Sequence, residues 1–285
     1  MTTSNTIENK YDFVFIFDVK NGNPNGDPDN GNAPRIDVET GKGYVTDVCL
    51  KRKSRNYVQI TKDKNSTDQI FIKSKAILNN QIEEAHEDEI VINAKDKEEA
   101  AREYLCKRYW DVRTFGAVLS TGTKKANNVH GAIQVTFSDS IDPIYSDTQH
   151  TITRCCRTTI ERAEKGGESE IGEKHAIHYA AYMGYGFVSA NLANKSWFTE
   201  DDLNLFFESF KNMFELDRAA ARGLMTMRKM YIFKHDNKYG NANSADLFDL
   251  IEIKKNKDVV RDWKDYDVKV GDVKTISDKI EMTEY

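Results

Sequence analysis

The segment that most constrains the fold of this chain is YDFVFIFDV, residues 11–19. Its odd-numbered positions from Tyr11 to Phe17 are aromatic, and Val14 and Ile16 lie between them. Successive side chains of a strand point to opposite faces, so an extended segment of this composition is apolar on both faces. We therefore predict a strand that is buried on both sides at the centre of a sheet.

A loop rich in glycine, proline and asparagine follows this strand. Residues 20–45 contain three of the four prolines and five of the 16 glycines, with Asn-Gly pairs that are typical of turns. A loop of this length inside a compact domain is more often functional than neutral. Its backbone N–H groups are suited to binding phosphate, with Asn25, Gly26 and Gly31 as candidate contacts, although it contains neither a P-loop motif nor GxGxxG.

A helix with basic residues is predicted next. Thr46 is a candidate N-cap, and residues 47–60 combine basic and apolar side chains with helical spacing. Two sets separate on a helical projection: Lys51, Arg52, Arg55 and Gln59 on one side, and Cys49, Leu50, Tyr57 and Ile60 on the other. We interpret this helix as having one buried face and one basic face.

The rest of the chain supplies further periodic elements. We predict helices at 96–109 and 199–214, strands at 111–120, 129–137, 176–190 and 228–235, and a short helix within 245–253. Thr199 and Asp202 resemble a capping box at the start of the second helix. Residues 61–95 look like an insertion, 138–174 form an excursion without apolar periodicity, and the last 25 residues are polar and partly frayed.

The order of the main elements is strand, helix, strand, strand, helix, strand. This order predicts an α+β fold on the ferredoxin-like plan of RNA-recognition domains, as one elaborated domain over residues 1–285 with insertions at 61–95 and 138–174. The plan hosts many unrelated functions, so it does not by itself assign one.

Charge is distributed unevenly along the chain. The net charge of −5 excludes a uniformly basic coat, but residues 83–99 hold eight acids against two bases. A second basic cluster, which includes Arg222 and Arg228, follows the helix at 199–214. Two basic segments on an acidic chain indicate that one face of the protein carries a row of basic side chains that binds phosphate groups. No apolar stretch is long enough to span a membrane and no secretion signal is present, so we expect a cytoplasmic protein without membrane contact.

Metal binding and catalysis are the alternatives to simple RNA binding. Asp27, Asp29 and Asp37 do not match a calcium loop, but loop carboxylates of this kind can hold magnesium in a ribonuclease. His175 and His178 point to opposite faces of a strand, and the four cysteines match neither a zinc site nor a disulfide framework. We expect no cofactor and no metal, and keep a metal-dependent ribonuclease as the alternative function.

Residues 17–37, FDVKNGNPNGDPDNGNAPRID, and 39–58 closely resemble the backbone subunit of type I-C CRISPR surveillance complexes. This subunit is the Csd-type branch of the Cascade backbone family in the RAMP superfamily. Further similar segments are DVRTFGAVLS at 111–120, TITR at 151–154, GEKHAIHY at 172–179 and TMRKMYIFKHDNKYGNA at 226–242, so the resemblance covers roughly residues 11–255.

The resemblance implies a non-catalytic protein that binds CRISPR RNA. Several copies polymerise as a helical filament along the RNA, other Cascade subunits bind at the filament ends, and the guide is presented to target DNA. An RNA-recognition-like palm carries a thumb, which corresponds to residues 138–174 and kinks the RNA. The candidate RNA contacts are Asn25, Gly26, Gly31, Lys51, Arg52, Arg55, Gln59, Arg113, Arg154, Lys174, His175, Arg222 and Arg228.

Overall fold

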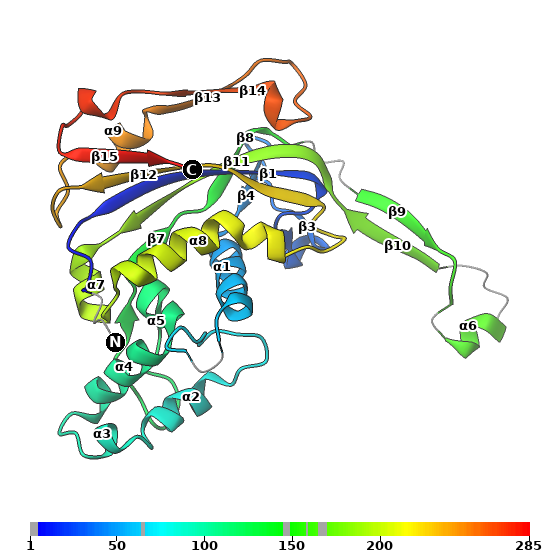
Figure 1. Cartoon of the computed structure of the whole chain (residues 1–285). Coiled ribbons are helices and arrows are strands. Elements are labelled where there is room, and N and C mark those ends of the chain that lie inside the picture. Colours follow the sequence, from blue (N-terminus) through cyan, green and yellow to red (C-terminus); the bar gives the residue numbers. More distant parts are fainter. Residues whose placement is uncertain (1–4, 64–65, 145–148, 158, 165–169) are drawn as a thin grey trace.

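The computed structural model describes residues 5–63, 66–144, 149–157, 159–164 and 170–285. Within these residues the centre of the protein is a seven-stranded antiparallel sheet in the order β15-β12-β1-β11-β8-β4, with β7 also paired to β11 (Figure 1). Its strands are β1 Tyr11–Gly22, β4 Lys42–Val45, β7 Ile133–Val135, β8 Ser138–Pro143, β11 Ile177–Val188, β12 Leu224–His235 and β15 Ile280–Glu284. The predicted central strand is confirmed, because β1 lies between β11 and β12.

The predicted ferredoxin-like plan is also confirmed. Helix α1, Asp47–Thr61, follows β1, and helix α8, Glu200–Leu216, follows β11 after the short helix α7, Ala190–Ser196. The inner strands of the sheet follow the order β12, β1, β11 and then β7 and β8, which both pair with β11. This is the order that two strand-helix-strand units produce, one through α1 and one through α8. The capping box of Thr199 and Asp202 starts α8 as predicted.

One face of the sheet packs on α1 and α8 through aromatic side chains. Phe13 contacts Phe206 at 5.6 Å between ring centroids, and Phe15 contacts Phe210 at 5.2 Å. Glycines stand opposite these phenylalanines on β11, with Gly186 paired to Phe13 and Gly184 to Phe15. A Cβ atom at either glycine would collide with the ring, so the absent side chains make room for the aromatic layer.

The other face of the sheet packs on the C-terminal part of the chain. Val14 and Ile16 contact a layer made by helix α9, Ser244–Phe248, and the hairpin of β13, Ile251–Lys255, and β14, Tyr266–Val270, with 3₁₀ helices at Trp263–Asp265 and Val273–Thr275. The prediction that the last 25 residues are partly frayed is wrong, because β15 pairs with β12 and extends the main sheet. The C-terminal layer therefore covers the sheet face on which RNA-recognition domains stack bases.

A helical lobe lies below α1 and α8 in Figure 1. Its helices are α2 Leu78–Ala85, α3 Glu89–Ile92, α4 Lys97–Arg108 and α5 Trp110–Phe115, followed by the short strands β5 Gly116–Ala117 and β6 Val129–His130. The helix predicted at 96–109 is confirmed as α4. The strand predicted at 111–120 is wrong for its first half, because the buried polar side chains of Asp111, Arg113 and Thr114 make contacts that hold residues 110–115 as a helix, and only 116–117 form a strand, β5. The predicted insertion at 61–95 falls within this lobe.

An arm projects from the body on the side away from the lobe (Figure 1). It consists of the antiparallel strands β9, Gln149–Arg154, and β10, Glu170–His175, with the short helix α6, Ile160–Glu164. The arm begins later than the predicted excursion at 138–174. Strand β8 belongs to the main sheet, where Ser138 and Ser140 are buried. Residues 145–148, 158 and 165–169 of that predicted segment lie outside the described residues.

Candidate nucleic-acid interface

The glycine-rich loop folds as a small hairpin beside the N-terminus of α1. Strands β2, Gly26–Asp27, and β3, Ala33–Pro34, flank a 3₁₀ helix at Pro28–Asn30. Asp27 caps this helix by accepting a hydrogen bond from the backbone N–H of Asp29 at 3.2 Å. Gly31 ends it with φ of +56°, a left-handed conformation that favours glycine.

Asn25 connects the loop to helix α1. Thr46 is the N-cap of α1, as predicted, but its own side chain makes no capping hydrogen bond. Instead, Asn25 Oδ1 accepts hydrogen bonds from Thr46 N at 3.0 Å and from Thr46 Oγ1 at 2.9 Å. The side-chain oxygen of Asn25 therefore positions the first turn of the helix.

The loop also lies against the turn between α8 and β12. The backbone N–H of Asn23 donates to the carbonyl of Ala221 at 2.8 Å. A Cβ atom at Gly22 would collide with the carbonyl of Arg222, so the two segments approach as closely as glycine permits. This contact brings Arg222, predicted from the second basic segment, beside the loop.

Four cations from three segments act electrostatically on the thiol of Cys49. They are Arg35 from the loop, Arg52 and Lys53 from α1, and Arg222 from the turn before β12, and we call them the basic cluster. Burial raises the pKa of the Cys49 thiol, and the four positive charges oppose this rise. Burial also lowers the pKa of Lys53 to about 8, with Arg222 and Arg52 acting in the same direction.

The basic cluster is only partly neutralised by acids. Asp217 forms ion pairs with both Lys53 and Arg222, and Asp27 lies 3.7 Å from Arg35. Arg35 Nε is buried and has no hydrogen-bond partner among the described residues. Arg52 is exposed. Four cations against two carboxylates leave an excess of positive charge beside the backbone of the loop. Arg35 Nε is in addition a hydrogen-bond donor that remains available there.

The predicted division of α1 into a buried face and a basic face is wrong in part. Arg52 and Gln59 are exposed, but Lys51 and Arg55 are both buried. Lys51 pairs with Asp47 at 2.8 Å, and Arg55 pairs with Asp111 at 2.8 Å. Ile60, predicted on the buried face, is 62% exposed. The reason is that α1 packs on α5 as well as on α8, so a single helical stripe does not describe its environment.

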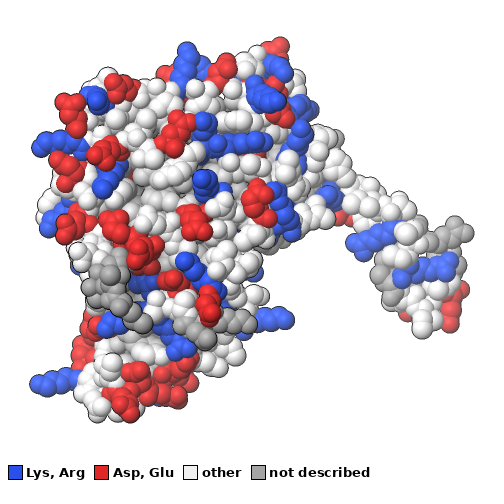
Figure 2. All heavy atoms as spheres, in the orientation of Figure 1, with Lys and Arg blue, Asp and Glu red and all other residues white. Residues whose placement is uncertain are grey.

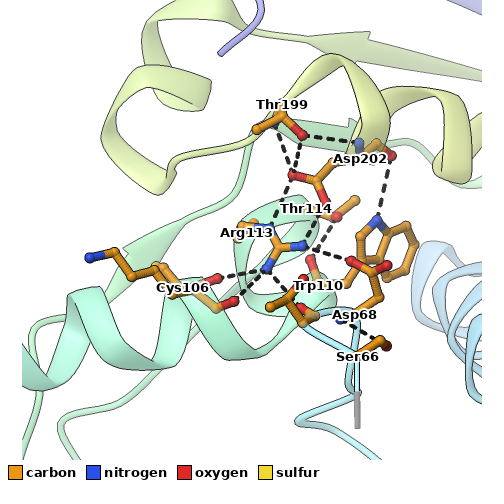
Figure 3. Close-up of polar contacts among 10 residues, drawn as sticks. Ser66, Asp68, Cys106, Trp110, Arg113, Thr114, Thr199 and Asp202 are labelled. Atoms are coloured by element: carbon orange, nitrogen blue, oxygen red, sulfur yellow. Dashed lines mark hydrogen bonds and ion pairs between the residues drawn. The ribbon is translucent and has the colours of Figure 1, made fainter. Parts of the chain in front are cut away.

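Arg113 has a structural role. Its guanidinium lies between α4, α5, the start of α8 and the loop that carries Asp68 (Figure 3). It binds both carboxylate oxygens of Asp202, at 2.6 and 3.1 Å, and donates to Asp68 and to the carbonyl of Cys106. Because the side chain is buried and its donors bind these internal acceptors, Arg113 does not face a nucleic acid in this structure.

Arg228 lies on β12 and pairs with a buried acid. Its guanidinium is 2.8 Å from Asp18 Oδ2, which also accepts a hydrogen bond from the hydroxyl of Tyr179 at 2.8 Å. Asp18 follows Ile16 by two positions on β1, so it points toward the C-terminal layer. Arg228 is therefore on the opposite face of the sheet from the helix that carries Arg52.

The arm presents two different faces. His150, Ile152, Arg154 and Lys174 share one face, because Gly172 pairs with Ile152 and Lys174 pairs with His150. His175 pairs with Gln149 on the other face. Arg154 is exposed and its guanidinium lies over Gly172. Of the predicted arm residues, Arg154 and Lys174 thus lie on one face of the arm and His175 lies on the other.

The loop carboxylates do not form a common site. Asp27 caps the 3₁₀ helix, and Asp37 accepts a hydrogen bond from Thr40 Oγ1 at 2.6 Å. Asp29 is exposed. Throughout the described part of the chain, no three His, Cys, Asp or Glu side chains gather in a way that could hold a metal ion.

The surface carries both charges. Figure 2 shows Lys and Arg side chains interspersed with Asp and Glu over the body, while acidic side chains gather at the lower end of the lobe, where Figure 1 places α2 and α3. No helix in the described ranges has the length and apolar character required to cross a membrane.

Arg35 and Lys53 are not among the candidate site residues predicted from the sequence. Arg35 comes to the cluster because residues 35–37 cover the free edge of β4, where Tyr44 N donates to the carbonyl of Arg35 at 3.0 Å. Lys53 lies outside the helical sector that holds Arg52, so its position next to Asp217 is visible only when α8 is in place. Neither position has a local sequence signal.

The fold and the site together define an α+β protein with a ferredoxin-like sheet and a basic, glycine-rich loop at one end of it. The chain belongs to the family of CRISPR-associated protein Cas7, whose model matches residues 9–271. The resemblance found in the sequence is confirmed at the level of this family.

Individual proteins are also similar to this chain. A CRISPR-associated protein Cas7 of Haloferax volcanii is 25% identical over 276 residues, which cover 87% of this chain and 76% of that protein. A chain of a CRISPR RNA-guided surveillance complex is 14% identical with a TM-score of 0.46, over 79% of this chain and 68% of the other. A chain of a type III-B Cmr-beta complex bound to cognate target RNA is 12% identical with a TM-score of 0.42, over 79% and 61%.

Proposed function

We propose that this protein is a non-catalytic backbone subunit that binds CRISPR RNA in a type I-C surveillance complex of the cytoplasm. The observation that carries the proposal is the basic cluster beside the glycine-rich loop, in a member of the Cas7 family. Copies of the subunit polymerise along the RNA, other Cascade subunits bind at the filament ends, and the RNA pairs with target DNA.

The chemistry of the site suits a protein that must accept any guide sequence. Guanidinium and ammonium groups bind phosphate without reading bases, and so do the backbone N–H groups of a loop that contains Gly26 and Gly31. Base edges then stay free to pair with a target strand. Arg35, Arg52 and Arg222 supply phosphate contacts, and Gln59 extends this surface along α1. Lys51, Arg55 and Arg113 are not included, because these side chains are buried and each pairs with an acid of the chain.

The arm is proposed to act as the thumb. Its cationic face, with Arg154 and Lys174, presents Ile152 at 40% exposure between charged side chains. A hairpin with phosphate-binding cations around an apolar side chain can hold the RNA backbone and unstack neighbouring bases. Arg228 and His175 remain candidates for contacts with the RNA or with the next subunit.

RNA binding by the purified subunit tests this proposal. Fluorescence anisotropy with unrelated RNAs of equal length, measured over a range of salt concentrations, should give the same affinity for each sequence. Arg52→Ala should weaken binding to all of them and reduce the salt dependence by about one unit of slope. Lys254→Ala is the matched control, because Lys254 is exposed on β13, on the far face of the sheet. Equal binding by wild type and Arg52→Ala would remove α1 from the site.

The same RNAs incubated with magnesium separate the proposed function from a ribonuclease. We expect intact RNA with wild type. Cleavage that disappears in Asp29→Ala would contradict a non-catalytic role and assign the loop carboxylates to a metal.

A further inference from the structure

A groove in the helical lobe is lined by residues other than those of the proposed RNA site. It encloses about 430 Å³ between α3, α4 and residues 66–69. Ile90, Val91, Ala100 and Tyr104 supply its apolar wall. Ile90 at the rim is 76% exposed, whereas the neighbouring Val91 is buried in the core of the lobe.

The exposure of Ile90 follows from the short length of α3 and from the packing of Val91. This helix has only four residues, and Asp88 caps it by accepting a hydrogen bond from Ile90 N at 2.9 Å. Because Val91 packs into the core of the lobe, the neighbouring Ile90 and Ile92 face solvent, with 76% and 51% of their surface exposed. A single exposed apolar side chain is ordinary, but isoleucine at the rim of an apolar groove is typical of a docking site.

The surroundings of the groove are acidic. Its lining holds two acids, Asp88 and Glu103, and two bases, Lys107 and Arg108, while Figure 2 shows acidic side chains gathered around it at this end of the lobe. The cations in the lining already have carboxylate partners, since Lys107 pairs with Glu103 at 2.7 Å and Arg108 with Glu84 at 3.0 Å. An anionic surface repels nucleic acid and attracts cationic segments.

We propose that this groove, defined by Ile90, Val91, Ala100, Glu103 and Tyr104, binds a basic segment of a partner protein that carries large apolar side chains. The apolar side chains enter the groove, and lysine or arginine side chains pair with the acids around it. None of the residues that line the groove belongs to the basic cluster, so such a partner is expected to bind while the basic cluster holds RNA. This inference does not depend on the RNA-binding proposal.

A model peptide provides the test. The probe is a fluorescein-labelled amphipathic helix made only of leucine and lysine, and its counterpart replaces every lysine with glutamate. We expect one lysine peptide to bind per chain by anisotropy titration, with affinity that falls as salt concentration rises, and no binding of the glutamate peptide. Ile90→Ser should lower the affinity for the lysine peptide by about tenfold, because the complex no longer buries one large aliphatic side chain.

A matched control separates the groove from general attraction to acids. Val38 is 93% exposed and lies between Asp37 and Glu39, so Val38→Ser also removes an exposed aliphatic group beside acids. It should bind the lysine peptide as wild type does. Ala100→Phe fills the groove instead of trimming it, and should weaken binding even if Ile90→Ser disturbs α3. Circular dichroism and melting temperature establish that each variant is folded.

Several outcomes would overturn the inference. These are no binding of the lysine peptide, equal affinity for wild type, Ile90→Ser and Ala100→Phe, or equal binding of both peptides. Loss of RNA binding in both Ile90→Ser and Ala100→Phe, measured without the peptide, would assign the groove to nucleic acid instead. Sedimentation velocity tests whether a second copy of the chain occupies the groove. If the wild type is a dimer and Ile90→Ser is a monomer, the groove binds the chain itself and not a different protein.

Discussion

Arg55 Nε donates a 2.8 Å hydrogen bond to Asp111 Oδ2, and both side chains are buried. The same carboxylate accepts hydrogen bonds from the backbone N–H groups of Phe71 at 2.7 Å and Ile72 at 3.0 Å. Asp111 therefore connects α1, α5 and the segment that enters the lobe. A residue that the sequence places on an exposed basic face serves instead to attach the helical lobe to the body.

Arg55→Ala should lower the free energy of unfolding by about 3–5 kcal/mol, because it leaves a buried carboxylate without its cation. Urea unfolding followed by circular dichroism measures the change. Lys107→Ala is the control, since Lys107 forms an exposed i,i+4 pair with Glu103 and should change stability by less than about 0.5 kcal/mol. A loss for Arg55→Ala no larger than that of the control would show that the pair does not stabilise the fold.

Asn25→Ala should cost about 1 kcal/mol of stability, because Thr46 loses the oxygen that binds its N–H and hydroxyl groups. Asn25→Asp keeps an acceptor oxygen at this place and adds a negative charge near a helix N-terminus, so it should stay close to wild type. Thermal melts of the two variants measure the difference. If both variants melt at the same temperature, the side-chain oxygen of Asn25 does not cap α1.

Substitutions at the loop glycines should impair RNA-dependent assembly more than Asp29→Ala does. A side chain at Gly26 would meet Asn32, and valine at Gly31 would be strained at φ of +56°. Asp29 is exposed, and its removal leaves the backbone of the loop intact. Filament formation on RNA, observed by negative-stain electron microscopy or sedimentation, provides the measurement. Normal filaments from both Gly26→Val and Gly31→Val would refute the argument that the loop acts through its backbone.

Asp18 should make stability depend on pH. Burial raises the pKa of the Asp18 carboxyl above its ordinary value, although Tyr179 and Arg228 act in the opposite direction. The folded protein then holds a proton on Asp18 more tightly than the unfolded chain does, so this contribution to stability is present in acid and is lost as pH rises through the folded pKa. In Asp18→Asn the contribution is absent at every pH.

The free energy of unfolding of wild type, relative to Asp18→Asn, should therefore decrease as pH rises above about 4, the ordinary pKa of an aspartate carboxyl. Urea titrations of both proteins across this range give the difference directly. A difference that increases with pH would mean that the ion pair with Arg228 outweighs burial and lowers the pKa of Asp18.

The local pattern of residues was sufficient for the framework of this fold. Alternating aromatic and β-branched side chains identified β1 as the central strand, and the spacing of Thr199, Asp202 and the phenylalanines identified α8. These signals are readable because burial repeats every two residues in a strand and about every 3.6 in a helix. The order of such elements was enough to predict the ferredoxin-like plan.

The site depended on contacts between distant parts of the chain. The sequence predicts Arg55 and Arg113 as cations available for RNA. In the structure they form buried ion pairs with Asp111 and Asp202, which lie 56 and 89 residues further along the chain. Arg35, Lys53 and Arg222 meet because the loop, α1 and the turn before β12 converge at Cys49. Helical or strand periodicity reports which side of an element is buried and does not report which charged group from elsewhere will lie there. Whether a cation is neutralised inside the protein or remains available for RNA therefore follows from tertiary packing, because the carboxylate that decides it comes from another segment.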